Sequence, residues 1–80
     1  MTIEDMQAAA EHVAREIRES GARTNKDLPK ELRARFVAIR AELFQRGIFD
    51  PVLVRFDSAT VPQASPQEIA GQLSLLTSNL

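Results

Sequence analysis

The chain contains no cysteine, tryptophan or tyrosine, and its 80 residues include only three glycines and one histidine. Without cysteine, neither a disulfide framework nor a cysteine-based zinc site can form. A single histidine among scattered carboxylates gives no recognisable set of metal ligands, so we expect no metal and no other cofactor. Three isolated glycines cannot form a glycine-rich phosphate loop, and no tyrosine or tryptophan is present to stack on nucleic-acid bases.

Long apolar runs are absent as well. No segment approaches the roughly 20 apolar residues that cross a bilayer, and the first residues are acidic where a secretory signal would be basic. The content of 44% hydrophobic and 26% charged residues is typical of a globular domain. We therefore expect a single soluble, cytoplasmic domain over residues 1–80. A domain this small buries only roughly 60% of its unfolded surface, and a partner subunit is a common source of additional stability.

The first helix is predicted over about residues 3–20. Apolar residues recur there at spacings of three and four, which places them on one side of a helix: Ile3, Met6, Ala10, Val13 and Ile17. Thr2, followed three residues later by Asp5, resembles a capping box, and Ser20-Gly21 supplies a stop signal.

The second helix is predicted over about residues 28–46. Asp27 is the expected cap, Pro29 is tolerated in the first turn, and Gly47 can end the helix in a left-handed conformation. The expected core face repeats at spacings of four, three and four: Leu32, Phe36, Ile39 and Leu43. Because the connection to the first helix is short, the two helices should form an antiparallel hairpin.

Residues 48–64 are predicted to cross the side of the second helix that the first helix leaves uncovered. The sequence permits two local structures for them. Asp50-Pro51 is a good cap and first-turn pair for a short helix, whereas Val52, Val54 and Phe56 alternate as in a β-strand. Ser65, Pro66 and Glu68 then form a strong start signal for a third helix over about residues 66–77. The predicted fold class is all-α: a helical hairpin, an irregular or short-helical crossover, and a third helix.

No residue pattern indicates catalysis. His12 is expected on the surface, one turn from Glu16, and Ser65 is explained as a helix cap. Asp50 and Asp57 could divide the roles of acid and base in principle, but capping and turn formation explain them as well. We therefore predict no catalytic residues and a protein that is not an enzyme.

The charge distribution suggests one candidate surface. Residues 1–20 carry five acidic and two basic side chains, whereas residues 21–46 carry seven basic and three acidic ones. The simplest interpretation is that these charges pair across the hairpin, or that arginine stems cover apolar surface. The alternative is an anion-binding stripe of Lys30, Arg33 and Arg40, which would bind a nucleic acid or an acidic protein.

The apolar residues suggest another candidate surface. Phe44 and the residues of the crossover exceed what one partner helix can cover, and surplus apolar surface on a small domain often marks an interface. The candidate interface residues are Phe44, Phe49, Leu53 and Phe56. The predicted function is a non-enzymatic helical protein-protein interaction module, a homo-oligomer or an accessory subunit. The binding of an anionic partner through Lys30, Arg33 and Arg40 is the alternative.

Overall fold

The computed structural model describes residues 1–80 and contains helices but no strands. Four α-helices and one short 3-10 helix follow one another along the chain: α1 (Ile3–Glu19), η1 (Asn25–Asp27), α2 (Lys30–Gln45), α3 (Pro51–Val54) and α4 (Pro66–Ser78). The predicted all-α class is confirmed. Each main helix lies within two residues of its predicted bounds.

The ends of α1 are fixed by the predicted local signals. The hydroxyl of Thr2 accepts a hydrogen bond from the Asp5 N–H at 3.1 Å, and Gly21 follows the helix with a φ of 68°, a value that suits glycine. The buried face consists of Met6, Ala10, Val13, Ala14 and Ile17. Ile3, predicted on the same face, is exposed because it begins the first turn, beyond the packed part of the helix.

The start of α2 differs from the prediction. Asp27 lies in η1 and does not cap α2, whose N-cap is Pro29 without any capping side chain. Leu28 is extended, with ψ at 144°, because a residue before proline is pushed out of the helical region. The predicted core face of Leu32, Phe36, Ile39 and Leu43 is confirmed as buried.

The crossover adopts the helical alternative over one short turn, α3. The carboxylate of Asp50 accepts hydrogen bonds from the N–H groups of Val52 and Leu53 at 2.9 and 3.2 Å. Pro51 occupies the first helical position, where no N–H is needed. Gln72 of α4 donates a further hydrogen bond to Asp50 at 2.6 Å, so the same carboxylate ties α3 to α4.

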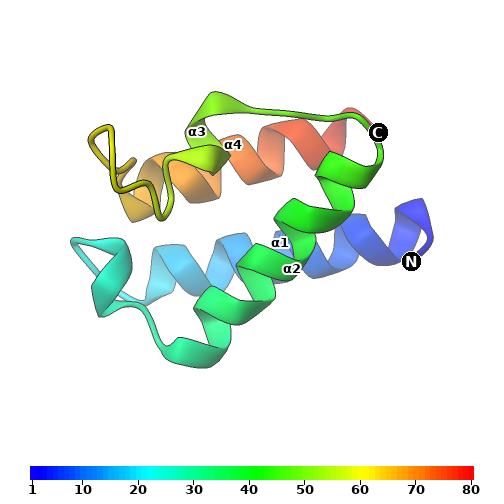
Figure 1. The fold of residues 1–80 in the computed structure, drawn as a ribbon. Coiled ribbons are helices and arrows are strands. Elements are labelled where there is room, and N and C mark those ends of the chain that lie inside the picture. The colour runs from blue at the N-terminus through cyan, green and yellow to red at the C-terminus, as the bar shows by residue number, and fades with distance from the viewer.

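The helix α4 is the principal neighbour of α1. It begins as predicted, with the hydroxyl of Ser65 accepting from the Glu68 N–H at 3.2 Å, and it runs antiparallel to α1 (Figure 1). Gln7 near one end of α1 donates to the Thr77 carbonyl at 2.9 Å, while Arg18 near the other end reaches the hydroxyl of Ser74 at 3.3 Å. In Figure 1, α2 turns back from α1 and crosses in front of it at an oblique angle.

The segment between α3 and α4 is held by a buried asparagine. The Asn25 side-chain amide donates to the carbonyls of Phe56 and Ala64, at 3.0 and 2.7 Å, while the Ala64 N–H donates to the Arg55 carbonyl at 3.1 Å. These bonds close residues 57–63 into a loop anchored at its base. The proline-containing connection is therefore fixed to η1 and to the end of α3.

One hydrophobic core joins all four α-helices. It contains sixteen buried residues, from Met6 in α1 to Leu73 in α4. None of the helices combines the length and the apolar character needed to span a bilayer.

Candidate interaction surfaces

Two of the four predicted interface residues belong to the core. Leu53 is fully buried, because it faces inward from α3. Phe56 is also buried, and its ring lies 4.4 Å, centroid to centroid, from the ring of Phe36 in α2. Neither residue offers surface to a partner, so the predicted apolar interface is reduced to Phe44 and Phe49.

Phe44 and Phe49 form an aromatic pair on the surface. Their ring centroids lie 5.1 Å apart, Phe44 is half-buried, and Phe49 is 71% exposed. No other large apolar side chain of the chain is as exposed as Phe49; the other exposed ones are Met1, Ile3, Val37, Val54, Val61 and Leu75.

The position of Phe49 is fixed by the backbone on both sides. Before it, Gly47 has a φ of 80° and the Ile48 N–H donates to the Leu43 carbonyl at 2.9 Å, which closes the end of α2. After it, Asp50 caps α3. Phe49 is therefore held on a two-residue bridge between two helix ends.

The side of α2 that faces away from the core is apolar as well. Five apolar residues recur there at helical spacing, and all are exposed except the half-buried Phe44. We call this set the outer face of α2: Ala34, Val37, Ala38, Ala41 and Phe44. Of these residues, only Phe44 was among the predicted interface residues. The signal was available, because a helix with apolar residues on two opposite sides has more apolar surface than one core can cover.

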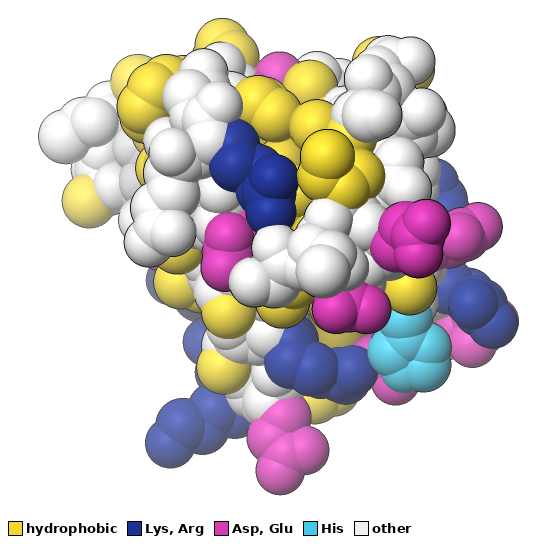
Figure 2. Space-filling model, turned by 90° about the vertical axis from the view of Figure 1, so that its right-hand side faces the viewer, with side chains coloured by type: hydrophobic (Ala, Val, Ile, Leu, Met, Phe, Trp, Pro, Cys, Tyr) yellow, Lys and Arg dark blue, Asp and Glu magenta, His cyan; other side chains and the backbone are white.

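Apolar side chains also gather at the end of the molecule that carries both chain termini. Figure 2 shows this side: apolar groups lie above and to the right of a basic side chain in its upper half, and most charged groups lie below. The helices α2 and α4 both end here (Figure 1). Ile48, Leu76 and Leu80 pack against the core and are only partly buried.

Of the three predicted anion-binding residues, Arg40 is already engaged. Its two terminal nitrogens donate to the two carboxylate oxygens of Asp57 at 2.8 and 3.0 Å, and one also donates to the Leu53 carbonyl at 3.0 Å. Its guanidinium carbon lies 5.8 Å from the centroid of the Phe36 ring. The hydrogen bonds from Arg40 lower the pKa of Asp57 below its ordinary value of 3.8. Arg40 therefore fixes the crossover to α2.

Lys30 and Arg33 have no acidic partner. Lys30 is exposed at the start of α2, and the Nε atom of the half-buried Arg33 is enclosed without a hydrogen-bond acceptor. Arg23 and Lys26 in the preceding connection are exposed and form no ion pair either. Four cations without an acidic partner therefore lie close together in the sequence, within residues 23–33.

Few charges pair across the hairpin. The only ion pair between side chains of α1 and α2 joins Arg35 to Glu16, which also lies 3.5 Å from His12. The N-terminal amino group approaches Glu42 to 4.0 Å. The predicted pairing of acidic side chains of α1 with basic side chains of α2 is therefore limited to one ion pair. The main neighbour of α1 is α4 and not α2.

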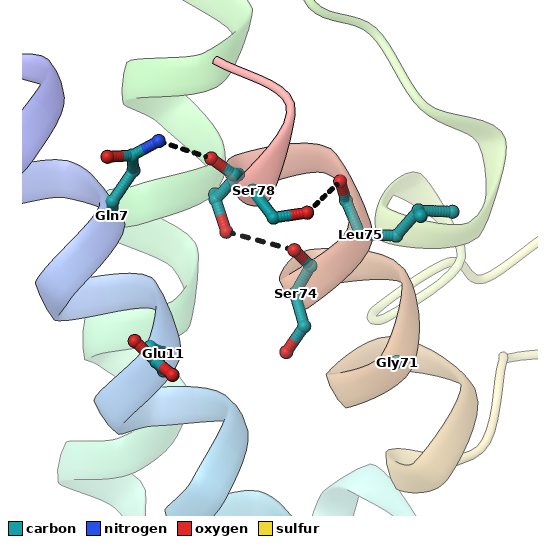
Figure 3. Close-up of a pocket in the computed structure, with 7 residues that line it drawn as sticks. Gln7, Glu11, Gly71, Ser74, Leu75 and Ser78 are labelled. Atoms are coloured by element: carbon teal, nitrogen blue, oxygen red, sulfur yellow. Dashed lines mark hydrogen bonds between the residues drawn. The ribbon is translucent and has the colours of Figure 1, made fainter.

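A polar groove of about 540 Å³ lies between α1 and α4 (Figure 3). Seven residues line it, and Leu75 is the single apolar one: Gln7, Glu11, Gly71, Ser74, Leu75, Thr77 and Ser78. The hydroxyls of Thr77 and Ser78 donate to carbonyls of their own helix. Glu11 is the one titratable group in the lining, so the groove does not place an acid opposite a base.

The remaining titratable groups do not converge. His12 is exposed beside Glu16, as predicted. Asp50 serves α3 and α4, and Asp57 is bound to Arg40. No group of three or more histidine, aspartate or glutamate side chains lies close enough together to hold a metal ion.

Comparison with known proteins gives no assignment. The chain matches no protein-family model, no curated protein and no solved structure. Only the surfaces described above therefore bear on the function of this chain.

Proposed function

We propose that this chain is a non-enzymatic helical module that binds another protein chain through the Phe44–Phe49 pair and the outer face of α2. The observation that carries the proposal is the 71% exposure of Phe49, a ring fixed between two capped helix ends. Removing an exposed aromatic ring from water contributes strongly to association. A partner would cover Phe49, Phe44 and the adjoining alanines together.

The rigid setting of Phe49 supports this proposal. A side chain on a flexible loop loses conformational entropy when it binds, at a cost of about 0.5–1.5 kcal/mol for each immobilised group. Phe49 is already restrained by its contact with Phe44 and by the hydrogen bonds on both sides of it. Less of the binding free energy is therefore lost on ordering.

Site-specific photocrosslinking in the native cell tests the proposal. A photoreactive phenylalanine analogue is placed at position 49 and, as a matched control, at Leu75, which is 57% exposed on α4. We expect a discrete protein adduct from position 49 and none from position 75. The absence of an adduct from position 49, or identical adducts from both positions, would contradict the proposal.

A second candidate function is the binding of an anionic partner by Lys30 and Arg33. The observation that favours it is the lack of any acidic partner for these two side chains, in contrast to Arg40. A double change, Lys30→Glu with Arg33→Glu, should abolish retention on an anionic polymer such as heparin at low salt. Arg15→Glu, at an exposed position on α1, is the control. Retention that is equal for the two variants would exclude this function.

A further inference from the structure

We infer that the outer face of α2 packs antiparallel against the same face of a second copy of this chain. The inference depends on the proposed function and names its partner. It starts from the composition of the outer face. At 100° per residue, the arc from Phe44 round to Ala38 contains Ala34, Val37 and Ala41, and its only polar members are Lys30 at the start and Gln45 at the end.

Apart from the Phe49 ring beside Phe44, nothing in the chain itself covers this arc. The opposite side of α2 carries the core residues Leu32, Phe36, Ile39 and Leu43. In Figure 1, α2 crosses in front of α1 and no other segment is drawn over it. The helix thus offers a second apolar side, about 24 Å long for 16 residues, to an external partner.

The arrangement of large and small residues on the outer face is self-complementary. When two α2 helices run antiparallel with the two-fold axis beside Ala38, Ala34 of one copy lies opposite the space between Ala41 and Phe44 of the other. Val37 likewise lies opposite the space between Ala38 and Ala41 of the second copy. Each large side chain meets small ones, which allows the two backbones to approach closely.

The charges along one edge of the outer face favour the same arrangement. Glu31, Arg35 and Glu42 share this edge at helical spacing. The antiparallel register places Arg35 beside Glu42 of the second copy. Because the axis is two-fold, this pair occurs twice, and it extends the existing Arg35–Glu16 pair.

A parallel pair of α2 helices is disfavoured by the same residues. It would bring the two Lys30 side chains together at the start of the face, without an acidic residue on the face to separate them. It would also align the two helix dipoles, whereas the antiparallel arrangement opposes them. The second copy is therefore reversed along α2.

The size of this contact sets the expected strength. One helix face together with Phe44 and Phe49 lies at the low end of specific interfaces, below about 1,200 Å² in total. We therefore expect a reversible dimer with a dissociation constant in the micromolar range. Sedimentation equilibrium should show a mass approaching twice 8.9 kDa as the concentration rises.

The absence of cysteine allows a direct test of the geometry, because each introduced cysteine is the only one in its chain. Ala38→Cys should form a disulfide-linked dimer rapidly under mild oxidation, since the two-fold axis places both sulfurs close together. Ala34→Cys alone should not, but an equimolar mixture of Ala34→Cys and Ala41→Cys should yield the mixed dimer. Ala8→Cys, at an exposed alanine of α1, is the control.

Two outcomes would overturn the inference. Efficient crosslinking of Ala34→Cys with itself would indicate a parallel pair, and crosslinking no faster than that of Ala8→Cys would indicate no pair. As an independent readout, Ala38→Glu should be monomeric by sedimentation with unchanged far-UV circular dichroism, whereas Ala8→Glu should dimerise like the unmodified chain.

The two proposals can fail separately. If photocrosslinking at position 49 captures a different protein while the purified chain stays monomeric at high micromolar concentration, the proposed function holds and the second copy is the wrong partner. If position 49 gives no adduct and the chain is monomeric, both fail.

Discussion

Arg40 binds Asp57 through two hydrogen bonds, one to each carboxylate oxygen, at 2.8 and 3.0 Å. The arginine is 14% exposed and the aspartate 55% exposed, so the pair lies at the boundary between core and solvent. The same guanidinium donates to the Leu53 carbonyl in α3. One side chain of α2 therefore fixes both the short helix and the loop that follows it.

This pair predicts a pH-dependent stability. The hydrogen bonds from Arg40 lower the pKa of Asp57 in the folded state below the ordinary value of 3.8. A carboxyl group whose folded pKa is depressed stabilises the fold above its unfolded pKa, and the contribution is lost as the pH falls through the folded value. We expect Asp57→Asn to lower the unfolding free energy at neutral pH, and the difference from the unmodified chain to disappear well below pH 3.8. Urea denaturation at several pH values measures this, and a difference that is constant with pH would contradict it.

Asn25 should be essential for the loop of residues 57–63. Asn25→Ala removes two buried hydrogen bonds, to the carbonyls of Phe56 and Ala64, and should cost about 2–3 kcal/mol of unfolding free energy. Hydrogen exchange should increase in the loop. Gln67→Ala, at an exposed position, should change the unfolding free energy by less than about 0.5 kcal/mol.

Two glycines should respond to alanine in opposite directions. Gly47 has a φ of 80°, at which an alanine backbone is strained, so Gly47→Ala should destabilise the fold by about 1 kcal/mol. The strain lies in the backbone alone, because no atom lies within 4 Å of the position that the alanine Cβ would occupy. Gly71 lies inside α4 with the same open surroundings. Gly71→Ala should therefore stabilise the fold by up to about 1 kcal/mol. Thermal denaturation measures both effects: the melting temperature should fall for Gly47→Ala and rise for Gly71→Ala.

Leu53 and Phe49 should separate stability from binding. Leu53→Ala creates a cavity in the core and should cost about 2–5 kcal/mol of unfolding free energy. Phe49→Ala removes a ring that is mostly in water and should change the monomer's unfolding free energy by about 1 kcal/mol or less. Chemical denaturation at low protein concentration measures both. A loss at Phe49 as large as that at Leu53 would show that Phe49 is structural.

The sequence predicted the elements that depend on neighbouring residues. The caps at Thr2, Asp50 and Ser65 each involve a hydrogen bond to an N–H group two or three residues away, so local sequence is sufficient to identify them. Asp27 was not a cap, because the strong restriction on the residue before Pro29 delayed the helix. That restriction is local as well.

The sequence could not show which of the predicted interface residues lie on the surface and which lie in the core. Phe44, Phe49, Leu53 and Phe56 have similar apolar character, but only the path of the crossover decides that Phe56 meets Phe36 while Phe49 meets water. Likewise, Arg40 and Arg33 belong to one helical stripe. Asp57, 17 residues from Arg40, is the partner that distinguishes them.

The sequence alone thus determined that α1, α2 and α4 are helices, to within two residues where each begins and ends, and which sides of α1 and α2 pack into the core, because helical periodicity and capping act over three or four residues. The tertiary structure decided that α4 is the main neighbour of α1, that Asn25 fixes the loop, and that the outer face of α2 is left uncovered. These features depend on contacts between residues far apart in the chain. An apolar pattern shows that a helix face is to be buried but does not specify what buries it.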